Sequence, residues 1–383
     1  MLKFRASGFI AATLILAASG NVARAQPVVP EVEESDIATL PAMGPHWALA
    51  MNAWMTGTRI VDGDSGKIIG ALHTIPLSNV AVDPNKRFFY VAETIWTKGN
   101  RGTRQDMLTV YDGKSLKIVT EIPLPGRLLT GNRIQDLAIS ADGRFAYIYD
   151  MSPASAVIIV DLTKRKVTRT IELPGCGLAF AAPGGRIVSL CNDGSIATVS
   201  LASKKDDVAQ TQPFFSADED PIFDNGILDP TTGKGLFLSY SGLIYEVSVG
   251  DETKVAPPWS IQEAAGMPAG SKKPLQLSWL PGGRQMMAYH AGLNQLYVLM
   301  HSGEFWSQKE PATELWVVDV ARRKVVSRRP LAPGVDYMAI SQDEHPLLFL
   351  SGRGDFRVVD ATTFETKHHV DGLGYGTITM VGP

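Results

Sequence analysis

The chain has 383 residues, of which 45% are hydrophobic, 36 are basic and 39 are acidic, so its formal net charge is −3. This length suits either two average domains or one large repeat architecture. The mild acidity disfavours nucleic acid and anionic lipid as partners, because both need concentrated basic charge.

The first 25 residues are predicted to be a secretory signal peptide. Lys3 and Arg5 give a positive start, an apolar stretch follows at residues 8–18, and Ala23-Arg24-Ala25 is a small-x-small cleavage site. The apolar stretch is short for a bilayer span, so an uncleaved membrane anchor is the less favoured interpretation. Cleavage would leave an exported chain with 33 basic and 39 acidic residues.

Residues 26–44 are rich in proline and glutamate and show little periodic apolar pattern. This composition predicts an extended or disordered N-terminal arm. We expect the folded part to occupy residues 45–383.

The stretch from Leu137 to Gly175 contains four short strand patterns separated by turn signals. Similar units recur along the chain, and each has a polar marker residue at the end of a strand. The seven markers are Asp62, Asp112, Asp161, Ser200, Ser248, Asp319 and Asp360. Four strands in a period of roughly 40 to 50 residues are typical of a β-propeller. The sequence therefore predicts an all-β chain, a seven-bladed β-propeller of four-stranded antiparallel blades.

Two further features of the repeats have structural explanations. A propeller ring is closed by overlap of its termini, so residues 376–381 (GTITMV) are expected to pair with strands from the N-terminal end. The marker aspartates are expected to accept backbone N–H groups of the turns that follow them. Seven near-equivalent positions do not all carry out catalysis.

Two segments exceed the repeat and are candidates for binding. Residues 95–106 (IWTKGNRGTRQD) lengthen a hairpin, and residues 257–274 widen one interval between markers. Within the second segment, Ser260 followed by Glu263 predicts the capped start of a short helix. Insertions on a repeat scaffold usually carry binding, although simple solvated loops are an equally good interpretation of either one alone.

Cys176 and Cys191 are the only cysteines of the chain. In an oxidising compartment, a lone pair on neighbouring strands most simply forms a structural disulfide. A redox-active or metal-binding role is less favoured, because it normally needs CxxC spacing or nearby histidines. Closing a loop of this length contributes about 3 kcal/mol in the chain-entropy account.

No catalytic motif is present in the sequence. There is no GxSxG, P-loop or HExxH pattern, and the seven histidines are scattered. His290 and His301 lie in neighbouring strand segments, but a structural role is favoured over a metal site. The acidic run Asp218-Glu219-Asp220 is interpreted first as a solvated turn. Several tryptophans, by contrast, lie in or beside loops, where aromatic residues with arginine are typical of a protein interface.

Several segments resemble the heavy chain of the quinoprotein amine dehydrogenases, the methylamine and aromatic amine dehydrogenases. They are RGTRQDMLTVYD (101–112), SPASAVIIVDL (152–162), PGCGLAFAAPGGRIVSLCNDGS (174–195), PGGRQMMAYHAGLNQLYVLM (281–300) and ISQDEHPLLF (340–349). The resemblance covers nearly the whole mature chain in order. EDPIF at residues 219–223 and the following Trp259-Ser260 favour the aromatic amine member.

The resemblance implies a periplasmic seven-bladed propeller that binds a small light chain in an α2β2 assembly. In that family the light chain carries the tryptophan tryptophylquinone cofactor and the catalytic base, and electrons leave to a blue copper protein of the amicyanin or azurin type. It also implies that no catalytic, cofactor-binding or metal-binding residue belongs to this chain, and that Cys176 and Cys191 form the family's heavy-chain disulfide.

Candidate site residues follow from the resemblance and from the insertions. The family offers a phenylalanine to the mouth of the substrate channel, four residues before a threonine; that place is held in this chain by Asn52, with Trp54 and Met55 nearby. These three residues are expected to line the channel. The expected light-chain contacts come from the two insertions and are Trp96, Arg101, Arg104 and Trp259.

Two other classes of function remain open at this point. The first alternative is a non-catalytic periplasmic propeller that presents its loops to another protein. A self-sufficient propeller hydrolase, such as a metal-dependent lactonase, requires carboxylates and asparagines that converge on a central ion. The sequence does not identify the amine substrate or the copper protein.

Overall fold

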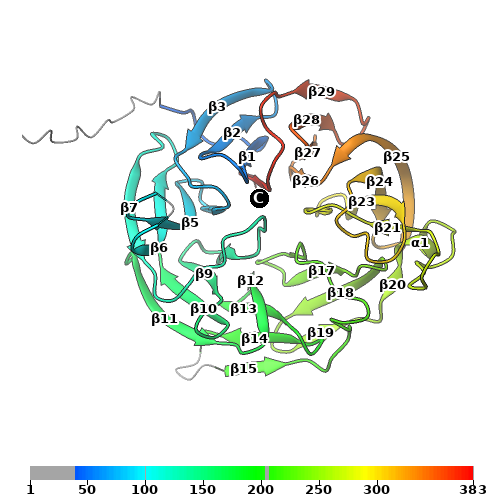
Figure 1. Ribbon diagram of the computed structural model, residues 1–383, viewed down its shortest axis with the longest axis horizontal. Coiled ribbons are helices and arrows are strands. Elements are labelled where there is room, and N and C mark those ends of the chain that lie inside the picture. Colours follow the sequence, from blue (N-terminus) through cyan, green and yellow to red (C-terminus); the bar gives the residue numbers. More distant parts are fainter. Residues whose placement is uncertain (1–38, 100, 203–206, 383) are drawn as a thin grey trace, which may run out of the picture. The chain divides into compact units, whose positions relative to one another are not determined.

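The computed structural model describes residues 39–99, 101–202 and 207–382. The predicted signal peptide and most of the predicted arm lie outside these residues. The described part consists almost entirely of strands, and its seven antiparallel sheets are arranged in a ring (Figure 1). This confirms the predicted seven-bladed β-propeller. No helix among the described residues is long and apolar enough to cross a membrane.

Blades 1 to 4 each contain four strands, which run in order from the innermost to the outermost. Blade 1 has β30 (Ile378–Met380), β1 (Trp47–Ala50), β2 (Thr58–Asp62) and β3 (Lys67–Leu72). Blade 2 has β4 (Asn79–Val82), β5 (Phe88–Trp96), β6 (Arg104–Asp112) and β7 (Ile118–Pro123). Blade 3 has β8 (Leu137–Ile139), β9 (Phe145–Asp150), β10 (Ala156–Asp161) and β11 (Lys166–Glu172). Blade 4 has β12 (Cys176–Ala182), β13 (Arg186–Cys191), β14 (Ile196–Ser200) and β15 (Asp207–Gln210).

Blades 5 to 7 follow the same plan with two interruptions. Blade 5 has β16 (Ile227–Leu228), β17 (Lys234–Leu238), β18 (Leu243–Val249), β19 (Thr253–Val255) and β20 (Trp259–Ser260). Blade 6 has β21 (Ser278–Pro281), β22 (Met287–His290), β23 (Gln295–Gly303), β24 (Ala312–Asp319) and β25 (Lys324–Val335). Blade 7 has β26 (Tyr337–Ile340), β27 (Leu347–Gly352), β28 (Asp355–Asp360) and β29 (Thr366–His369).

The two five-stranded sheets arise because one strand position is split. In blade 5, β19 and β20 both pair with β18, and Pro257 and Pro258 separate them. Proline has no N–H to donate to a sheet, which explains the break. The helix α1 (Ile261–Ala264) begins directly after β20, and the Ser260 Oγ accepts the Glu263 N–H at 3.2 Å. This confirms the helix start predicted from the sequence.

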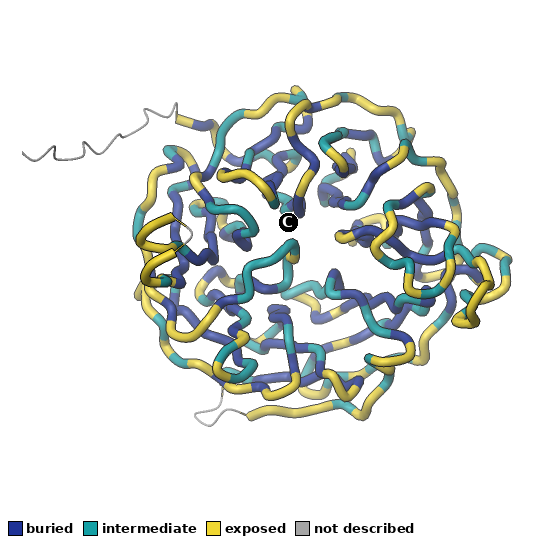
Figure 2. The backbone as a smooth tube through the Cα atoms, viewed as in Figure 1, coloured by how far each residue is buried: buried dark blue, intermediate teal, exposed yellow. Residues whose placement is uncertain are grey.

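The ring closes by pairing β30 with β1, with Leu49 opposite Thr379. The C-terminal segment thus supplies the innermost strand of the first blade, as predicted. The six apolar clusters of the core lie between neighbouring blades; one of them, for example, joins Tyr90 of blade 2 to Ile148 of blade 3. Figure 2 shows the consequence, with buried segments towards the inside of the ring and exposed ones on the outermost strands.

The marker aspartates cap the turns between the third and fourth strands. The Asp112 carboxylate accepts the N–H groups of Lys114 and Ser115, and the Asp360 carboxylate accepts those of Thr362 and Thr363. Backbone hydrogen bonds of these turns lower the pKa of both aspartates, because they stabilise the charged form. The structural interpretation of the markers is therefore confirmed.

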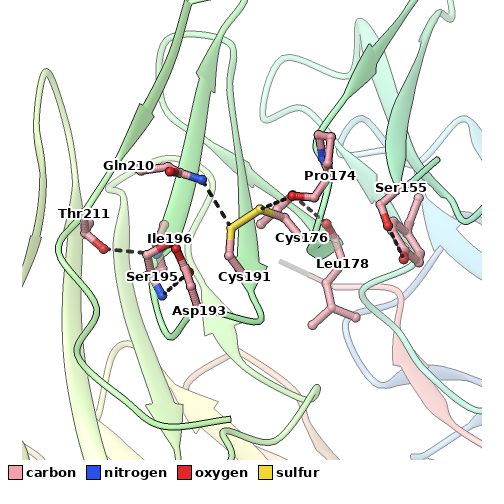
Figure 3. The surroundings of a disulfide bond; sticks show 12 residues. Ser155, Pro174, Cys176, Leu178, Cys191, Asp193, Ser195, Ile196, Gln210 and Thr211 are labelled. Carbon is pink, nitrogen blue, oxygen red and sulfur yellow. Dashed lines mark hydrogen bonds between the residues drawn. A yellow bond between two sulfur atoms is a disulfide. The ribbon is translucent and has the colours of Figure 1, made fainter.

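Cys176 and Cys191 form a disulfide between β12 and β13, where the two residues lie directly opposite each other (Figure 3). The side-chain amide of Gln210, on β15 of the same sheet, lies against the Cys191 sulfur. The disulfide predicted from the sequence is present, and it covalently links the innermost two strands of blade 4.

His46 joins the first blade to the last beside the closure. Its Nδ1 lies 2.7 Å from Asp64 of blade 1, and its Nε2 lies 2.9 Å from Asp343 of blade 7. A neutral imidazole donates from only one nitrogen, so two carboxylate partners favour the protonated ring. Burial opposes protonation, but these hydrogen bonds and charges outweigh it, and the pKa of His46 is raised.

We expect His46→Gln to destabilise the protein by about 1 kcal/mol at pH 6 and by much less at pH 9. Because the pKa of His46 is raised in the folded state, its contribution to the free energy of unfolding is fully present below the ordinary value of 6.5. This contribution is lost as the pH rises through the folded pKa. Melting temperatures at both pH values measure this. His345→Gln, in the same turn as Asp343, is the control, and an equal loss at both pH values would contradict the assignment.

Candidate functional site

The antiparallel order of the blades defines two faces of the ring. One face, which we call the upper face, carries the hairpin between the second and third strands of each blade and the connections between blades. The lower face carries the other two turns of each blade, including the aspartate turns. All seven residues proposed from the sequence as channel or interface positions lie at or near the upper edge of the ring.

Large exposed apolar side chains gather on the upper face. Thirteen such side chains occur among the described residues, and eight of them lie on upper-face loops or strand ends. The eight are Trp54, Met55, Trp96, Met151, Leu275, Leu277, Trp306 and Tyr375. Four of the others lie on outermost strands and one in a lower-face turn. Concentration of exposed apolar area on one face is typical of a surface that another protein covers.

The loop between β1 and β2 presents Trp54 and Met55 to solvent. Asn52 is only 8% exposed, and its Oδ1 accepts the N–H groups of Trp54 at 2.9 Å and Met55 at 3.0 Å. Trp54 is 79% exposed and Met55 60% exposed. The side chain of Asn52 therefore forms the turn, and its two neighbours form the presented surface.

The hairpin of β5 and β6 brings together three predicted interface residues. Arg104 is paired with Trp96 across the hairpin, and its guanidinium lies 6.0 Å from the Trp96 ring centroid. Arg104 also binds Asp106 through two nitrogens, at 2.6 and 2.7 Å. Arg101 lies at the tip of the hairpin and is exposed. Of the two arginines, Arg101 is thus the more available to a partner.

Trp259 lies apart from this group, on the outer strand of blade 5. Its indole N–H donates to Glu246 at 2.9 Å, and the Arg323 guanidinium lies 5.9 Å from its ring centroid. Arg323 belongs to blade 6 and also binds Glu246. Trp259 therefore contributes to packing between blades 5 and 6, and it is half-buried.

Sequence reasoning did not single out Leu275, Leu277, Met151 or Tyr375. The signal that identifies them is the occurrence of large apolar residues inside loop segments without strand periodicity. Trp306 has a clearer environment, since its ring lies 5.9 Å from Tyr240 and 4.8 Å from Phe305. These rings make an aromatic group on the upper face of blades 5 and 6.

Three aspartates with raised pKa values precede the innermost strands of blades 3, 5 and 7. Burial raises the pKa of Asp136 to about 7, and neither of its carboxylate oxygens has a hydrogen-bond partner of ordinary geometry. Burial also raises the pKa of Asp224, against the opposing charge of Arg133 at 2.8 Å. Asp336 behaves similarly, with Arg284 as its largest opposing charge. The rim of the upper face thus holds three carboxyl groups whose pKa values are raised by burial.

The histidines do not converge on one site. His290 binds the backbone oxygen of Asp343 at 2.9 Å, while His301 binds the Ser307 hydroxyl at 2.8 Å. Across the described ranges, no group of three or more His, Cys, Asp or Glu residues is arranged to hold a metal ion. Fold and surface together describe a propeller with an apolar face that suits contact with another protein.

The sequence profile of the methylamine dehydrogenase heavy chain matches residues 48–382, which is nearly the whole ring. The chain belongs to this family, and the family predicted from the sequence is confirmed. It is thus related to a heavy subunit of an amine-oxidising enzyme, a class that has a light-chain partner.

Curated relatives that match this chain over most of its length are also methylamine dehydrogenase heavy chains. The methylamine dehydrogenase heavy chain of Paracoccus versutus is 28% identical over 92% of this chain and 80% of its own. That of Methylobacillus flagellatus is 27% identical over 84% of this chain and 78% of its own. That of Methylophilus methylotrophus is 26% identical over 98% of this chain and 93% of its own.

Solved structures with other activities share the fold alone. The dihydro-haem d1 dehydrogenase NirN has a TM-score of 0.57 at 16% identity, covering 91% of this chain and 78% of that one. The hydrazine synthase of Kuenenia stuttgartiensis has a TM-score of 0.58 at 16% identity, covering 87% and 99%. At this identity the propeller scaffold says nothing about the reaction.

We expect Asp136→Asn to stabilise the chain by roughly 1 to 4 kcal/mol at pH 8 and to have little effect at pH 4. A raised folded pKa means that wild-type stability is highest below the unfolded pKa and falls as the pH rises towards about 7. Urea denaturation at both pH values measures the difference. Asp218→Asn, an exposed position, is the control, and a pH-independent effect would show that Asp136 has an ordinary pKa.

Proposed function

We propose that this chain is the heavy subunit of a periplasmic amine dehydrogenase, assembled with a light chain as an α2β2 heterotetramer. A primary amine and water give an aldehyde, ammonia, two protons and two electrons. The tryptophan tryptophylquinone cofactor and the catalytic base lie on the light chain, and the electrons pass to a blue copper protein of the amicyanin or azurin type. The gathering of exposed apolar side chains on the upper face, in a chain of this family, carries the proposal.

The upper face has the properties of a docking surface. Eight of the thirteen large apolar side chains exposed among the described residues lie on this face. Tryptophan is the residue most often found at the energetic centre of interfaces, and Trp54, Trp96 and Trp306 are all exposed there. We assign the light chain to this face, with Arg101 at its rim and with Arg104 and Trp259 acting chiefly through the packing of their own blades.

Trp54 is the best candidate for the aromatic ring at the mouth of the substrate channel. Asn52 occupies the place of the family's phenylalanine, but its amide is engaged in the turn that presents Trp54 and Met55. In this proposal Asn52 is a positioning residue, while Trp54 and Met55 line the mouth. The indole is larger than a phenyl ring, so the channel would differ in shape from that of its relatives.

The cofactor assignment to the light chain fits the tryptophans of this chain. Tryptophan tryptophylquinone, as its name says, joins two tryptophan side chains. Trp279 and Trp316 lie near each other, with ring centroids 5.8 Å apart, but the Arg328 guanidinium lies 4.7 Å from both centroids and Trp316 is fully buried. The Trp316 N–H donates to Glu314 at 2.7 Å. These contacts describe a packed structural group, and we assign the cofactor to the partner.

The second candidate function is that of a non-catalytic periplasmic propeller that binds another protein. The same apolar upper face favours it, because that surface alone does not specify what covers it. The two candidates differ in whether the partner carries a quinone.

Purification of the chain from its native source tests the proposed function. We expect a complex with a small partner that stains for quinone and that oxidises a primary amine in the presence of an artificial electron acceptor. A complex with a partner lacking quinone would support the binding module instead. A chain that purifies as a free monomer would overturn both candidates.

We expect Trp54→Ala to weaken assembly with the light chain at least tenfold, because a buried tryptophan at an interface is commonly worth about 2 kcal/mol. Ile68→Ala, an exposed apolar residue on the outermost strand of the same blade, is the matched control. Arg101→Glu should weaken assembly less and in a salt-dependent manner, with Lys67→Glu as its control. Light-scattering titration of purified subunits measures all four, and equal affinities would remove the upper face from the interface.

A further inference from the structure

The ring surrounds an axial cavity that is open to solvent and that the proposed function does not use. Its volume is about 340 Å³, and it is lined by the innermost strands of six blades. The wall includes Ala138, Phe180, Met287, Met338 and Met380. A volume of about 150 Å³ is enough for an apolar protein cavity to bind benzene, so this one has room for a single aromatic ring.

The wall of the axial cavity is uncharged and mostly apolar. None of the described residues that line it is an Asp, Glu, Lys, Arg or His. Its amide side chains are already engaged: Asn225 accepts the Met287 N–H at 2.9 Å, and Gln342 donates to the Tyr289 oxygen at 2.8 Å. A charged ligand would lose its hydration here without compensation, whereas a neutral apolar one would not.

The connection between blades 2 and 3, residues 124–136, crosses the upper end of the cavity. Asn132 in this connection donates to the Tyr337 hydroxyl of blade 7 and accepts the Thr377 N–H at 3.2 Å. Figure 1 shows this connection reaching towards the centre of the ring. Gln135 accepts the Ala179 N–H of blade 4 at 2.7 Å and donates to the Gly226 oxygen at the start of blade 5 at 2.8 Å.

A second set of hydrogen bonds between blades lies at the same end of the cavity. The Gln285 side chain of blade 6 donates to the Ile378 oxygen at 2.9 Å and accepts the Ile378 N–H at 2.8 Å. Together, these hydrogen bonds and those of Asn132 and Gln135 join blades 3, 4, 5, 6, 7 and 1 at the upper end of the cavity. Towards the lower face, by contrast, Leu228, Tyr289 and Met380 are partly exposed. We therefore expect a protein that covers the upper face to leave the lower opening of the cavity free.

We propose that the axial cavity is a binding site for one small, neutral, apolar molecule about the size of a single aromatic ring. The ligand contacts the partly exposed side chains of the innermost strands, such as Ala138, Ile139 and Met380. Methionine adapts well to aromatic edges. The site is independent of the upper face and of the light chain.

Fluorobenzene observed by fluorine NMR is the probe, titrated against the mature chain in the assembly in which it purifies. We expect saturable binding of one molecule per chain. Ala138→Leu, which fills part of the cavity at a partly exposed position, should weaken binding at least tenfold. Ala209→Leu makes the same chemical change on the exposed outermost strand of blade 4 and should leave binding unchanged.

Two further measurements keep the outcomes separate. Trp54→Ala should not alter fluorobenzene binding even if it abolishes assembly, so failure of the proposed function would leave this result intact. Crystals of the wild-type chain under xenon pressure should show xenon between the innermost strands, which tests the site even if Ala138→Leu does not fold. Lack of saturable binding, equal binding by wild type and a folded Ala138→Leu variant, or xenon bound elsewhere alone would overturn the proposal.

Discussion

The fold depends on one constraint, which is that each blade buries its two faces only against its neighbours. The apolar clusters lie between adjacent sheets, as where Phe180 of blade 4 meets Phe237 of blade 5 at 5.4 Å between ring centroids. A sheet at the end of an open array would expose one apolar face and one strand edge. The pairing of β30 with β1 removes both, and it makes the two ends of the chain part of one blade. His46 reinforces the same seam by binding carboxylates of blades 1 and 7.

Ring geometry also divides the molecule into a repetitive face and a variable one. On the lower face, an aspartate caps the turn between the third and fourth strands of several blades, as Asp112 and Asp360 do. On the upper face, the lengths of hairpins and blade connections differ from blade to blade, and the segment between β20 and β21 is one of the long ones. Loop surface that the scaffold does not need for closure is the part that is free to present Trp54, Leu275 or Trp306.

Features with a local cause were predictable from the sequence. The blade number followed from repeated strand and turn signals, the helix after Ser260 from a capping pattern, and the Cys176–Cys191 pair from its spacing and expected compartment. Features that depend on contacts distant in sequence were not predictable. Trp259 gives no sign in the sequence that Glu246 and Arg323 contact it. His46 likewise gives no sign that it binds Asp343 of the last blade. The buried state of Asp136 depends on how the connection between blades 2 and 3 lies over the ring, which no local pattern encodes.

Buried polar side chains and exposed apolar side chains have different roles in this structure. Many buried polar groups bind within their own blade, as Thr109 binds Glu93. Others join two blades, as Gln285 of blade 6 binds Ile378 of blade 1. On the upper face, eight exposed large apolar side chains supply area and shape for a contact. A rigid ring of this kind stabilises the position of whatever binds it, because its loops are fixed at both ends by sheets that cannot move independently of one another. A partner that brings reactive groups to such a face would have them held next to fixed loops. Binding would in turn remove the exposed tryptophans of the propeller from water.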